Sequence, residues 1–299
     1  MRPWPDQWAF LSSITRISPP QLEEFLEHLT AVAAGPGSVD AASLPLSEAR
    51  PAPPRMIGTL GAAISLEKAG LPPWLLADIK HLASLHNPVF YERQKLRLST
   101  FRTPRFITCY EEDVSHLHLP RGLLETLHKV VQKAGSVLSL TDLRRLPNQL
   151  VLKFHGTLTP LQAQAVRVML AHDHGVLVAP PGVGKTVMAC SIAAQRNLPV
   201  LVLVHRQPLL DQWRVHLMNL LGLSFGEIGQ IGGGKDRRTH MVDLAMIQTL
   251  KGVGNPEAFF AGYGLLIVDE CHHLPAFSFE SCVKRAPIRY VLGLTATPY

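Results

Sequence analysis

From residue 151 onward, short apolar runs alternate with longer segments whose apolar residues recur at helical spacing. Short apolar runs are typical of strands that are buried on both faces, and helices between them favour a mostly parallel sheet with helical cover. The pattern therefore predicts an α/β fold. Strands are expected at residues 176–179, 200–204, 242–247, 265–268 and 290–294, and helices at 160–172, 186–196 and 207–221.

Residues 56–150 show a weaker alternation that indicates a smaller α/β unit. A helix is expected from Pro72-Pro73 through Leu85, because proline is favoured in the first turn of a helix. The stretch 104–110 has the β-branched and aromatic content of a strand. A second amphipathic helix, ending at Gly135, is indicated by apolar residues that share one helical face: Leu123, Leu124, Leu127, Val130 and Val131.

The N-terminal stretch predicts a helix that is separate from these two units. Ser18 can cap that helix, prolines follow in its first turn, and Gly35 ends it. The following residues are rich in Gly, Pro, Ser and Ala, as in a linker. The expected organisation is a helical segment at 1–35, a linker at 36–55, a small α/β accessory domain at 56–150 and the larger α/β domain at 151–299.

Composition limits the classes of protein that fit this pattern. Of 299 residues, 46% are hydrophobic, yet no apolar run approaches the ~20 residues that cross a bilayer. The chain begins without an apolar signal region, so a cytoplasmic location is expected. Four scattered cysteines without Cys-x-x-Cys spacing argue against a disulfide framework or a zinc ribbon. A net charge of +6 favours a polyanionic partner.

A glycine-containing loop joins the expected strand 176–179 to the expected helix 186–196. Glycines let successive backbone N–H groups point inward, and the helix N-terminus adds positive potential, so the loop suits a di- or triphosphate. Lys185 would reach the terminal phosphates and the Thr186 hydroxyl would bind Mg²⁺. The first glycine of the usual phosphate-binding pattern is replaced by Ala179, so a plain glycine-bearing turn stays open as an alternative. The loop residues are Pro181, Gly182, Val183 and Gly184.

Two carboxylates follow the apolar run 265–268. Asp269 is expected to hold Mg²⁺ opposite Thr186, while Glu270 orients and deprotonates an attacking water. The run Asp269-Glu-Cys-His-His could instead form a metal cluster. Adjacent residues at a strand end point in opposite directions, which disfavours that alternative. Nucleotide hydrolysis is the chemistry that the two motifs predict together.

A third feature is a basic stretch with interleaved aromatic residues in the accessory domain. Positive side chains can meet phosphates and rings can meet bases, so the stretch could be a DNA surface. A solvated charged face is the competing interpretation, and the sequence does not choose between them. The basic residues are Arg93, Lys95, Arg97, Arg102 and Arg105, and the aromatic residues are Phe90, Tyr91, Phe101 and Phe106.

The order of motifs resembles the first RecA-like lobe of superfamily 2 DEAD/DEAH-type helicases, which are P-loop NTPases. The motifs are Leu158-Thr-Pro-Leu-Gln-Ala-Gln, Ala179-Pro-Pro-Gly-Val-Gly-Lys-Thr, Leu203-Val-His-Arg, Ala245-Met-Ile-Gln-Thr-Leu, Asp269-Glu-Cys-His-His and Leu294-Thr-Ala-Thr-Pro. The resemblance implies ATP and Mg²⁺ as cofactors, with Gln162 against adenine. It implies that Arg206, Gln248 and Thr249 touch the nucleic-acid backbone. It also implies that Thr295 and Thr297 couple the ATP site to strand movement.

The small α/β module ahead of the lobe is similar to the arrangement in XPB-like DNA-repair helicases. The first 35 residues resemble the tail of primase-type domains fused to such helicases in bacterial conflict systems. The resemblance implies an ATP-dependent helicase or translocase that acts on single- or double-stranded DNA. A non-motor ATP-binding switch is the alternative. Because no second RecA-like lobe follows Tyr299, this chain alone is expected to bind ATP with near-background hydrolysis.

Overall fold

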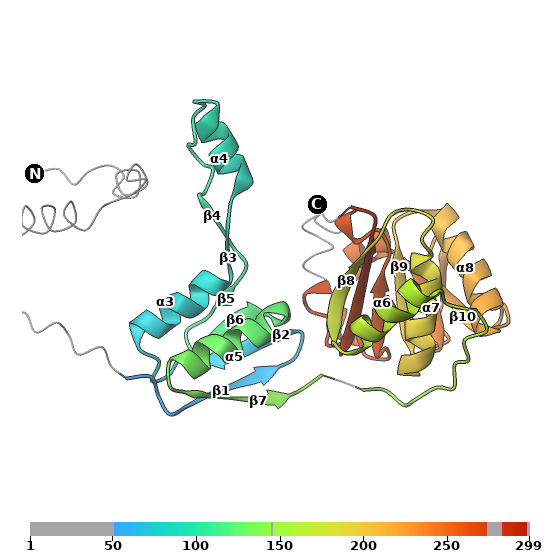
Figure 1. The fold of residues 1–299 in the computed structure, drawn as a ribbon, viewed down its shortest axis with the longest axis horizontal. Helices are drawn as coiled ribbons and strands as arrows, with labels where there is room; N and C mark the ends of the chain where they lie inside the picture. The colour runs from blue at the N-terminus through green and yellow to red at the C-terminus, as the bar shows by residue number, and fades with distance from the viewer. Residues whose placement is uncertain (1–50, 145, 274–282, 298–299) are drawn as a thin grey trace, which may run out of the picture. The chain divides into compact units, whose positions relative to one another are not determined.

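The computed structural model describes residues 51–144, 146–273 and 283–297, and from Ala52 onward these belong to one compact unit. The predicted helix after Ser18 and most of the predicted linker lie outside these residues. Strands of the described residues form three sheets (Figure 1). Across the same ranges, every helix falls short of the length and apolar character that a bilayer-crossing segment requires.

Residues 55–142 contain a five-stranded sheet with the order β5-β6-β2-β1-β7, and we keep the name accessory domain for this region. Buried and exposed side chains alternate along β1, β2 and β6, so one face of the sheet packs against helices α3 and α5. Ile64, Leu75 and Leu127 are fully buried in this core. The elements are β1 (Arg55–Leu60), β2 (Ala63–Glu67), α3 (Pro73–Leu82), β5 (Glu111–Glu112), β6 (His116–Pro120), η1 (Arg121–Leu123), α5 (Leu124–Lys133) and β7 (Val137–Asp142).

The second predicted helix of this domain is confirmed, whereas the first ends three residues early. Helix α3 ends at Leu82, and Ser84 pairs with Thr108 in an antiparallel sheet. The Ser84 hydroxyl also donates to the carbonyl of Lys80, which satisfies one free carbonyl at the end of α3. Ser84–His86 (β3) and Phe106–Thr108 (β4) form the two-stranded sheet, and α4 (Pro88–Lys95) lies between them. We call residues 84–108 the arm.

The larger domain contains a seven-stranded sheet with the order β11-β10-β12-β9-β13-β14-β8. Every neighbouring pair is parallel except β10 with β11, which is antiparallel. All five predicted strands are present, and β9 and β13 have the predicted bounds. The strands are β8 (His174–Val178), β9 (Val200–Val204), β10 (Ile228–Gly232), β11 (Lys235–Arg237), β12 (Val242–Met246), β13 (Leu265–Val268) and β14 (Tyr290–Thr295).

Helices cover both faces of this sheet. On one face Val202 packs with Met188 of α7 and Trp213 of α8, and on the other Leu203 packs with Phe260 of α9. Successive residues of one strand thus enter opposite cores, as expected for a parallel sheet between helical layers. The helices are α6 (Pro160–Leu170), α7 (Lys185–Arg196), α8 (Gln207–Leu221) and α9 (Pro256–Phe260), with 3₁₀ turns η2 (Ile247–Gly252) and η3 (Cys271–His273).

Candidate nucleotide site

The glycine loop forms a turn between β8 and α7 that L-residues with side chains would disfavour. Gly182 and Gly184 have φ of 81° and 87°, in the left-handed region where glycine costs nothing. A Cβ at Gly184 would also lie 2.6 Å from Nε2 of Gln162. Local backbone geometry therefore requires glycine here, and the loop places the N-terminus of α7 at the carboxyl end of β8. This is the arrangement that binds phosphate.

Gln162 lies against the glycine loop, as its predicted role requires. Thr159 caps α6, and its hydroxyl accepts from the Gln162 N–H. The Gln162 side chain in turn accepts from the Thr159 N–H at 2.9 Å and donates to the carbonyl of Val183 at 2.8 Å. The capping box therefore fixes the amide at the wall of the loop. Its contact with adenine stays a prediction.

Lys185 is folded over the loop that it follows. Its Nζ donates to the carbonyl of Ala179 at 2.8 Å and to that of Pro180 at 3.3 Å. Residue 179 contacts Lys185 through its backbone carbonyl, which any residue has. Alanine can therefore replace the usual glycine at this position of the loop. Hydrogen bonds between an ammonium and phosphate oxygens are stronger than those to neutral carbonyls. Lys185 can therefore exchange these carbonyls for the oxygens of a bound phosphate.

Asp269 is buried at the end of β13, with 8% of its surface exposed. One carboxylate oxygen accepts from the indole N–H of Trp213 at 2.8 Å, and the other accepts from the Glu270 N–H at 3.0 Å. Burial raises the pKa of Asp269, while the Trp213 and Glu270 hydrogen bonds and the charge of Lys185 act in the opposite direction. Strands β13 and β8 both flank β14, so Asp269 and the loop that carries Lys185 lie at the same carboxyl edge of the sheet.

Glu270 has φ of 48°, an uncommon conformation for a glutamate. Such backbone strain gathers at functional sites, where the surrounding structure enforces it. His272 in η3 places its Nδ1 3.4 Å from a carboxylate oxygen of Glu270 and 3.0 Å from the hydroxyl of Thr295. The Thr295 hydroxyl donates to the carbonyl of Thr297 at 2.6 Å. His272 therefore lies between Glu270 and the two predicted coupling threonines, within ion-pair distance of the carboxylate and hydrogen-bonded to Thr295.

The sequence interpretation missed this role of His272, because it considered the histidine only as a metal ligand. Among the described residues, no group of three or more His, Cys, Asp or Glu could hold a metal ion. The metal-cluster alternative therefore has no support there. The spacing of His272, two positions after Glu270, was the signal that could have indicated the link.

ATP with Mg²⁺ fits the residues that are present. The glycine loop offers backbone N–H groups to phosphate, and Lys185 offers a positive charge. Thr186 lies in the first turn of α7 and supplies a hydroxyl, while Asp269 supplies a carboxylate. Oxygen ligands of this kind are those that Mg²⁺ prefers.

The predicted nucleic-acid residues lie at the same edge of the sheet, after β9 and β12. Arg206 is the exposed N-cap residue of α8. The side-chain amide of Gln248 donates to the carbonyl of His205 at 2.8 Å, which ties the loop after β12 to the loop after β9. Thr249 follows Gln248 in η2. The fold thus brings the three residues close together, and their contact with nucleic acid stays a prediction.

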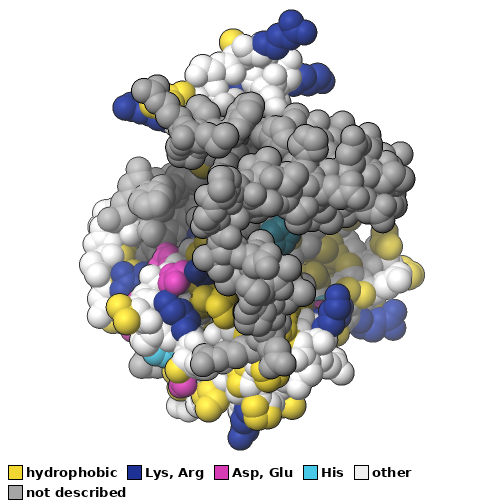
Figure 2. All heavy atoms as spheres, turned by 90° about the vertical axis from the view of Figure 1, so that its left-hand side faces the viewer, with side chains coloured by type: hydrophobic (Ala, Val, Ile, Leu, Met, Phe, Trp, Pro, Cys, Tyr) yellow, Lys and Arg dark blue, Asp and Glu magenta, His cyan; other side chains and the backbone are white. Residues whose placement is uncertain are grey.

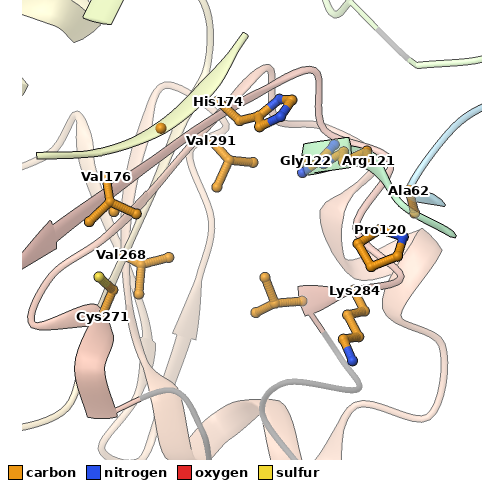
Figure 3. A pocket seen from close by; sticks show the side chains of 13 residues that line it. Ala62, Pro120, Arg121, Gly122, His174, Val176, Val268, Cys271, Lys284 and Val291 are labelled. Carbon is orange, nitrogen blue, oxygen red and sulfur yellow. The ribbon is translucent and has the colours of Figure 1, made fainter. Parts of the chain in front are cut away.

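A separate pocket of about 460 Å³ lies on the α9 side of the sheet (Figure 3). Val176, Val268, Cys271 and Val291 form much of its wall. Among the described residues that line it there is no Asp or Glu, so they offer no carboxylate base. Burial raises the pKa of the Cys271 thiol, which keeps it protonated at neutral pH. The nucleotide chemistry therefore belongs to the glycine loop.

Known proteins match the larger domain in sequence. The family model described as type III restriction enzyme, res subunit, matches residues 155–299. A putative DNA 3'-5' helicase Rad25 of Halobacterium salinarum is 37% identical over 153 residues, covering 50% of this chain and 25% of the relative. The DNA 3'-5' translocase XPB2 of Sulfurisphaera tokodaii is 33% identical over 137 residues, covering 46% and 30%. The chain thus spans less than a third of either relative.

One solved structure also shares the fold of the accessory domain and the larger domain together. The UvsW helicase from bacteriophage T4 superposes with a TM-score of 0.60 at 16% identity, covering 81% of this chain and 92% of that one. At this identity the likeness concerns the fold. Residues 155–299 are thus similar in sequence to the restriction-enzyme res subunit model and to the Rad25 and XPB2 relatives, and their mostly parallel sheet has the strand order of a RecA-like lobe.

Proposed function

We propose that this chain carries the first motor lobe of an ATP-dependent DNA helicase or translocase. One observation carries the proposal: the nucleotide residues and the residues expected to hold DNA share the carboxyl edge of one parallel sheet. Arg206 begins α8, and the same helix carries Trp213, which contacts Asp269. The expected DNA contact at Arg206 and the nucleotide residue Asp269 are therefore connected through α8 and one hydrogen bond.

The proposed reaction is hydrolysis of the terminal phosphate of ATP. Backbone N–H groups of the glycine loop and Lys185 hold the phosphates, and Thr186 with Asp269 holds Mg²⁺. The metal neutralises charge on the phosphate oxygens when bound. Glu270 accepts the proton of the attacking water. His272 transmits the state of Glu270 to Thr295.

A second RecA-like lobe is part of the proposal. Pro181 and Gly182 are exposed, so the loop is open to a partner domain on its outer side. A cationic group supplied across such a cleft typically raises turnover by roughly 10³–10⁵-fold. The named relatives are described as 3'-5' enzymes, and we propose the same polarity for this motor.

Nucleotide binding by the 299-residue chain tests the proposal directly. Lys185→Ala should weaken ATP–Mg²⁺ binding by roughly 10–100-fold, because a charge-assisted contact to phosphate contributes about 1.5–3 kcal/mol. Lys153→Ala, at an exposed lysine outside the loop, is the matched control and should bind normally. Calorimetry gives both affinities. Equal affinities for the two variants would contradict the assignment of the site.

The second measurement separates a motor from a switch. With a second lobe supplied in the same chain or separately, DNA should stimulate phosphate release by orders of magnitude. A switch would instead change its DNA affinity with bound nucleotide and show no stimulated turnover. That result would replace the motor by a nucleotide-controlled binding module.

A further inference from the structure

The arm is held together without an apolar core. No residue of α4 is buried, and every residue of β4 is exposed. Asn87 instead fastens the base of the arm: its side chain accepts from the Val89 N–H and donates to the carbonyl of Pro104 at 2.7 Å. Its backbone N–H donates to the carbonyl of Arg105 at 2.9 Å. These bonds join the start of α4 to the end of the loop that follows it.

Ring contacts and polar contacts hold the middle of the arm. The hydroxyl of Tyr91 bonds His86 Nδ1 at 2.7 Å and accepts from Arg105 Nε at 3.0 Å. His86 also packs against Phe106, with ring centroids 4.9 Å apart. Arg93 donates to the hydroxyl of Thr103 at 2.8 Å, which links α4 to the loop that follows it. These contacts hold the shape of the arm, while the side chains of α4 and β4 stay unburied.

The tip of the arm exposes apolar and basic side chains together. Phe101 is 78% exposed and Leu96 is 60% exposed, although burying such groups would be favourable. The guanidinium of Arg102 lies over the Phe101 ring at 5.5 Å. Figure 2 shows dark-blue Lys and Arg side chains at the top of the view, where α4 lies in Figure 1.

The charge of this segment is of one sign. From Arg93 to Tyr110 the sequence has five Lys or Arg residues and no Asp or Glu. Arg97 and Arg102 have φ of 55° and 62°. A left-handed conformation disfavours a long side chain, and the lobe has Asn197 where its own helix α7 ends in that conformation. The arm thus retains arginine at two strained positions where a smaller residue would fit better.

We propose that the arm tip binds nucleic acid where a duplex opens into single strands. Phe101 stacks on a base that has lost its neighbour at the junction, and Lys95, Arg97 and Arg102 neutralise the flanking phosphates. An exposed aromatic ring needs an unstacked base, which an intact duplex does not offer. A charged face that only aids solubility has no need of an exposed phenylalanine. This inference rests on the proposed motor function and names the DNA structure on which the motor acts.

Binding of the 299-residue chain to three fluorescent DNAs tests the junction assignment. The DNAs are a forked duplex, a blunt duplex and a single strand, measured by anisotropy over a range of salt concentrations. Phe101→Ala should weaken fork binding by roughly five- to hundred-fold, the range for loss of one base–aromatic stack, with a smaller effect on blunt duplex. Phe101→Trp should retain the preference for the fork.

Changing Lys95, Arg97 and Arg102 together to Ala should weaken binding to all three DNAs and lower the slope of log affinity against log salt by roughly two to three. The matched control is Phe225→Ala, which removes another exposed phenylalanine with an arginine over its ring, Arg214 at 4.7 Å. Phe225 precedes β10 and so lies at the amino end of the strands, away from the proposed DNA edge. This control should bind the fork normally.

The outcomes separate the two proposals. Unchanged fork binding in both arm variants, with wild-type binding intact, would overturn the arm inference and leave the motor proposal standing. An equal loss on fork and blunt duplex in Phe101→Ala would overturn the junction assignment. If the wild-type chain binds none of the three DNAs while ATP still binds, the DNA motor function fails and the arm inference with it.

A different observation carries a second inference, about Trp213. This residue is 1% exposed, and its indole N–H donates to the Asp269 carboxylate at 2.8 Å. The Glu270 N–H fixes the other oxygen at 3.0 Å. Two donors on two oxygens define the plane of the carboxylate. We infer that Trp213 is a positioning residue, which orients Asp269 so that the remaining lone pairs face the metal and its water shell.

Trp213→Phe tests this role because it keeps an aromatic ring and removes the N–H. We expect nucleotide binding in EDTA to be unchanged. Partners that orient metal ligands typically affect metal affinity by roughly 10–100-fold, so the Mg²⁺ concentration that gives half of the gain in nucleotide affinity should rise by that factor. A fluorescent nucleotide titrated with Mg²⁺ measures it.

Tyr263→Phe is the matched control, since the Tyr263 hydroxyl donates to another buried carboxylate, that of Asp243, at 2.5 Å. It should leave the Mg²⁺ titration unchanged. A Trp213→Phe titration no different from that of the control would overturn the positioning role. An equal loss of nucleotide affinity in EDTA and in Mg²⁺ would also overturn it, because it would indicate general packing. If wild-type nucleotide binding ignores Mg²⁺, the metal assignment itself fails.

Discussion

The nucleotide edge of the larger domain and the tip of the arm place their functional groups by different forces. Asp269 and Glu270 follow a strand that is buried on both faces, so a large apolar core fixes where they lie. Arg97 and Phe101 lie on a segment without buried side chains in α4 or β4, which hydrogen bonds of Asn87 and Tyr91 hold in shape. The first region is positioned by packing and the second by polar contacts.

This difference has a consequence for binding. A core-mounted site holds its groups to the geometry that a reaction needs, since packed interiors resist small displacements. A segment held by exposed hydrogen bonds opens locally at a lower free-energy cost. The lobe is therefore suited to catalysis on one small nucleotide, and the arm is suited to a partner whose shape varies along its length.

Each region contains a residue with a strained backbone, so strain alone does not distinguish the nucleotide edge from the arm. Glu270 in the lobe and Arg97 in the arm each have a positive φ. At Glu270 the core on both sides of β13 offsets the cost of strain. At Arg97 the surrounding contacts are few, so the strain should be measurable as a local effect.

The largest expected effect is on the chemistry at the core-mounted site. Glu270→Gln should preserve ATP binding and reduce DNA-stimulated phosphate release by roughly 10²–10⁴-fold, because it removes a base and keeps the shape. Binding of forked DNA through the arm should be unchanged. Phosphate release is measured with a second lobe present, and calorimetry gives the ATP affinity. Wild-type turnover in this variant would show that another group is the base.

Sequence predicted the larger domain well because its signals are local. The runs at 200–204 and 265–268 are uninterrupted and apolar, and the structure has strands with those bounds. Gly182 and Gly184 adopt a left-handed backbone that favours glycine. Glycines at this spacing therefore make the loop recognisable from the sequence alone. In contrast, β10 was missed because its sequence, Ile-Gly-Gln-Ile-Gly, lacks a continuous apolar run.

Contacts between residues distant in sequence could not be predicted. Trp213 and Asp269 are 56 positions apart, and nothing in the sequence around either residue indicates their hydrogen bond. Of the arm, strand β4 was predicted, because Phe106–Thr108 lies within the expected strand 104–110. Helix α4 was missed, since it has no buried stripe and the base of the arm depends on Asn87 reaching Pro104. Composition alone indicated the basic stretch, but the exposure of Phe101 required the fold.

A smaller effect should separate packing from charge at Asp269. Burial raises the pKa of this carboxyl above its ordinary value of 3.8, so the folded state binds its proton more tightly than the unfolded chain does. That contribution to stability is present at low pH and is lost as pH rises through the raised pKa. Asp269→Asn has no such loss. In EDTA, the Tm of Asp269→Asn should therefore rise relative to the Tm of the wild type between pH 4 and pH 8.

Differential scanning calorimetry over this pH range gives the two curves. The difference between them matters more than either absolute Tm, because asparagine also changes the hydrogen bond to Trp213. Tyr263→Phe provides a reference in which the Asp269 charge is kept, and its Tm should stay parallel to the wild-type curve. Parallel curves for Asp269→Asn as well would mean that Asp269 titrates normally in the fold.

The smallest expected effect concerns strain in the arm. Asparagine tolerates a left-handed backbone better than arginine does, so Arg97→Asn should relieve part of the cost that φ of 55° imposes. Relief of roughly 0.4–1 kcal/mol slows local opening about two- to fivefold. The Leu98 N–H, which donates to the carbonyl of Arg93 at 2.8 Å, reports this opening by hydrogen exchange. The Val202 amide in the central strand β9 serves as the internal control and should not change.

The Arg97→Asn variant should also bind forked DNA more weakly, since it loses one positive charge. Slower exchange with unchanged DNA binding would mean that the strain at Arg97 is unrelated to nucleic acid, and the role of the arm would then depend on Phe101 and the remaining basic residues.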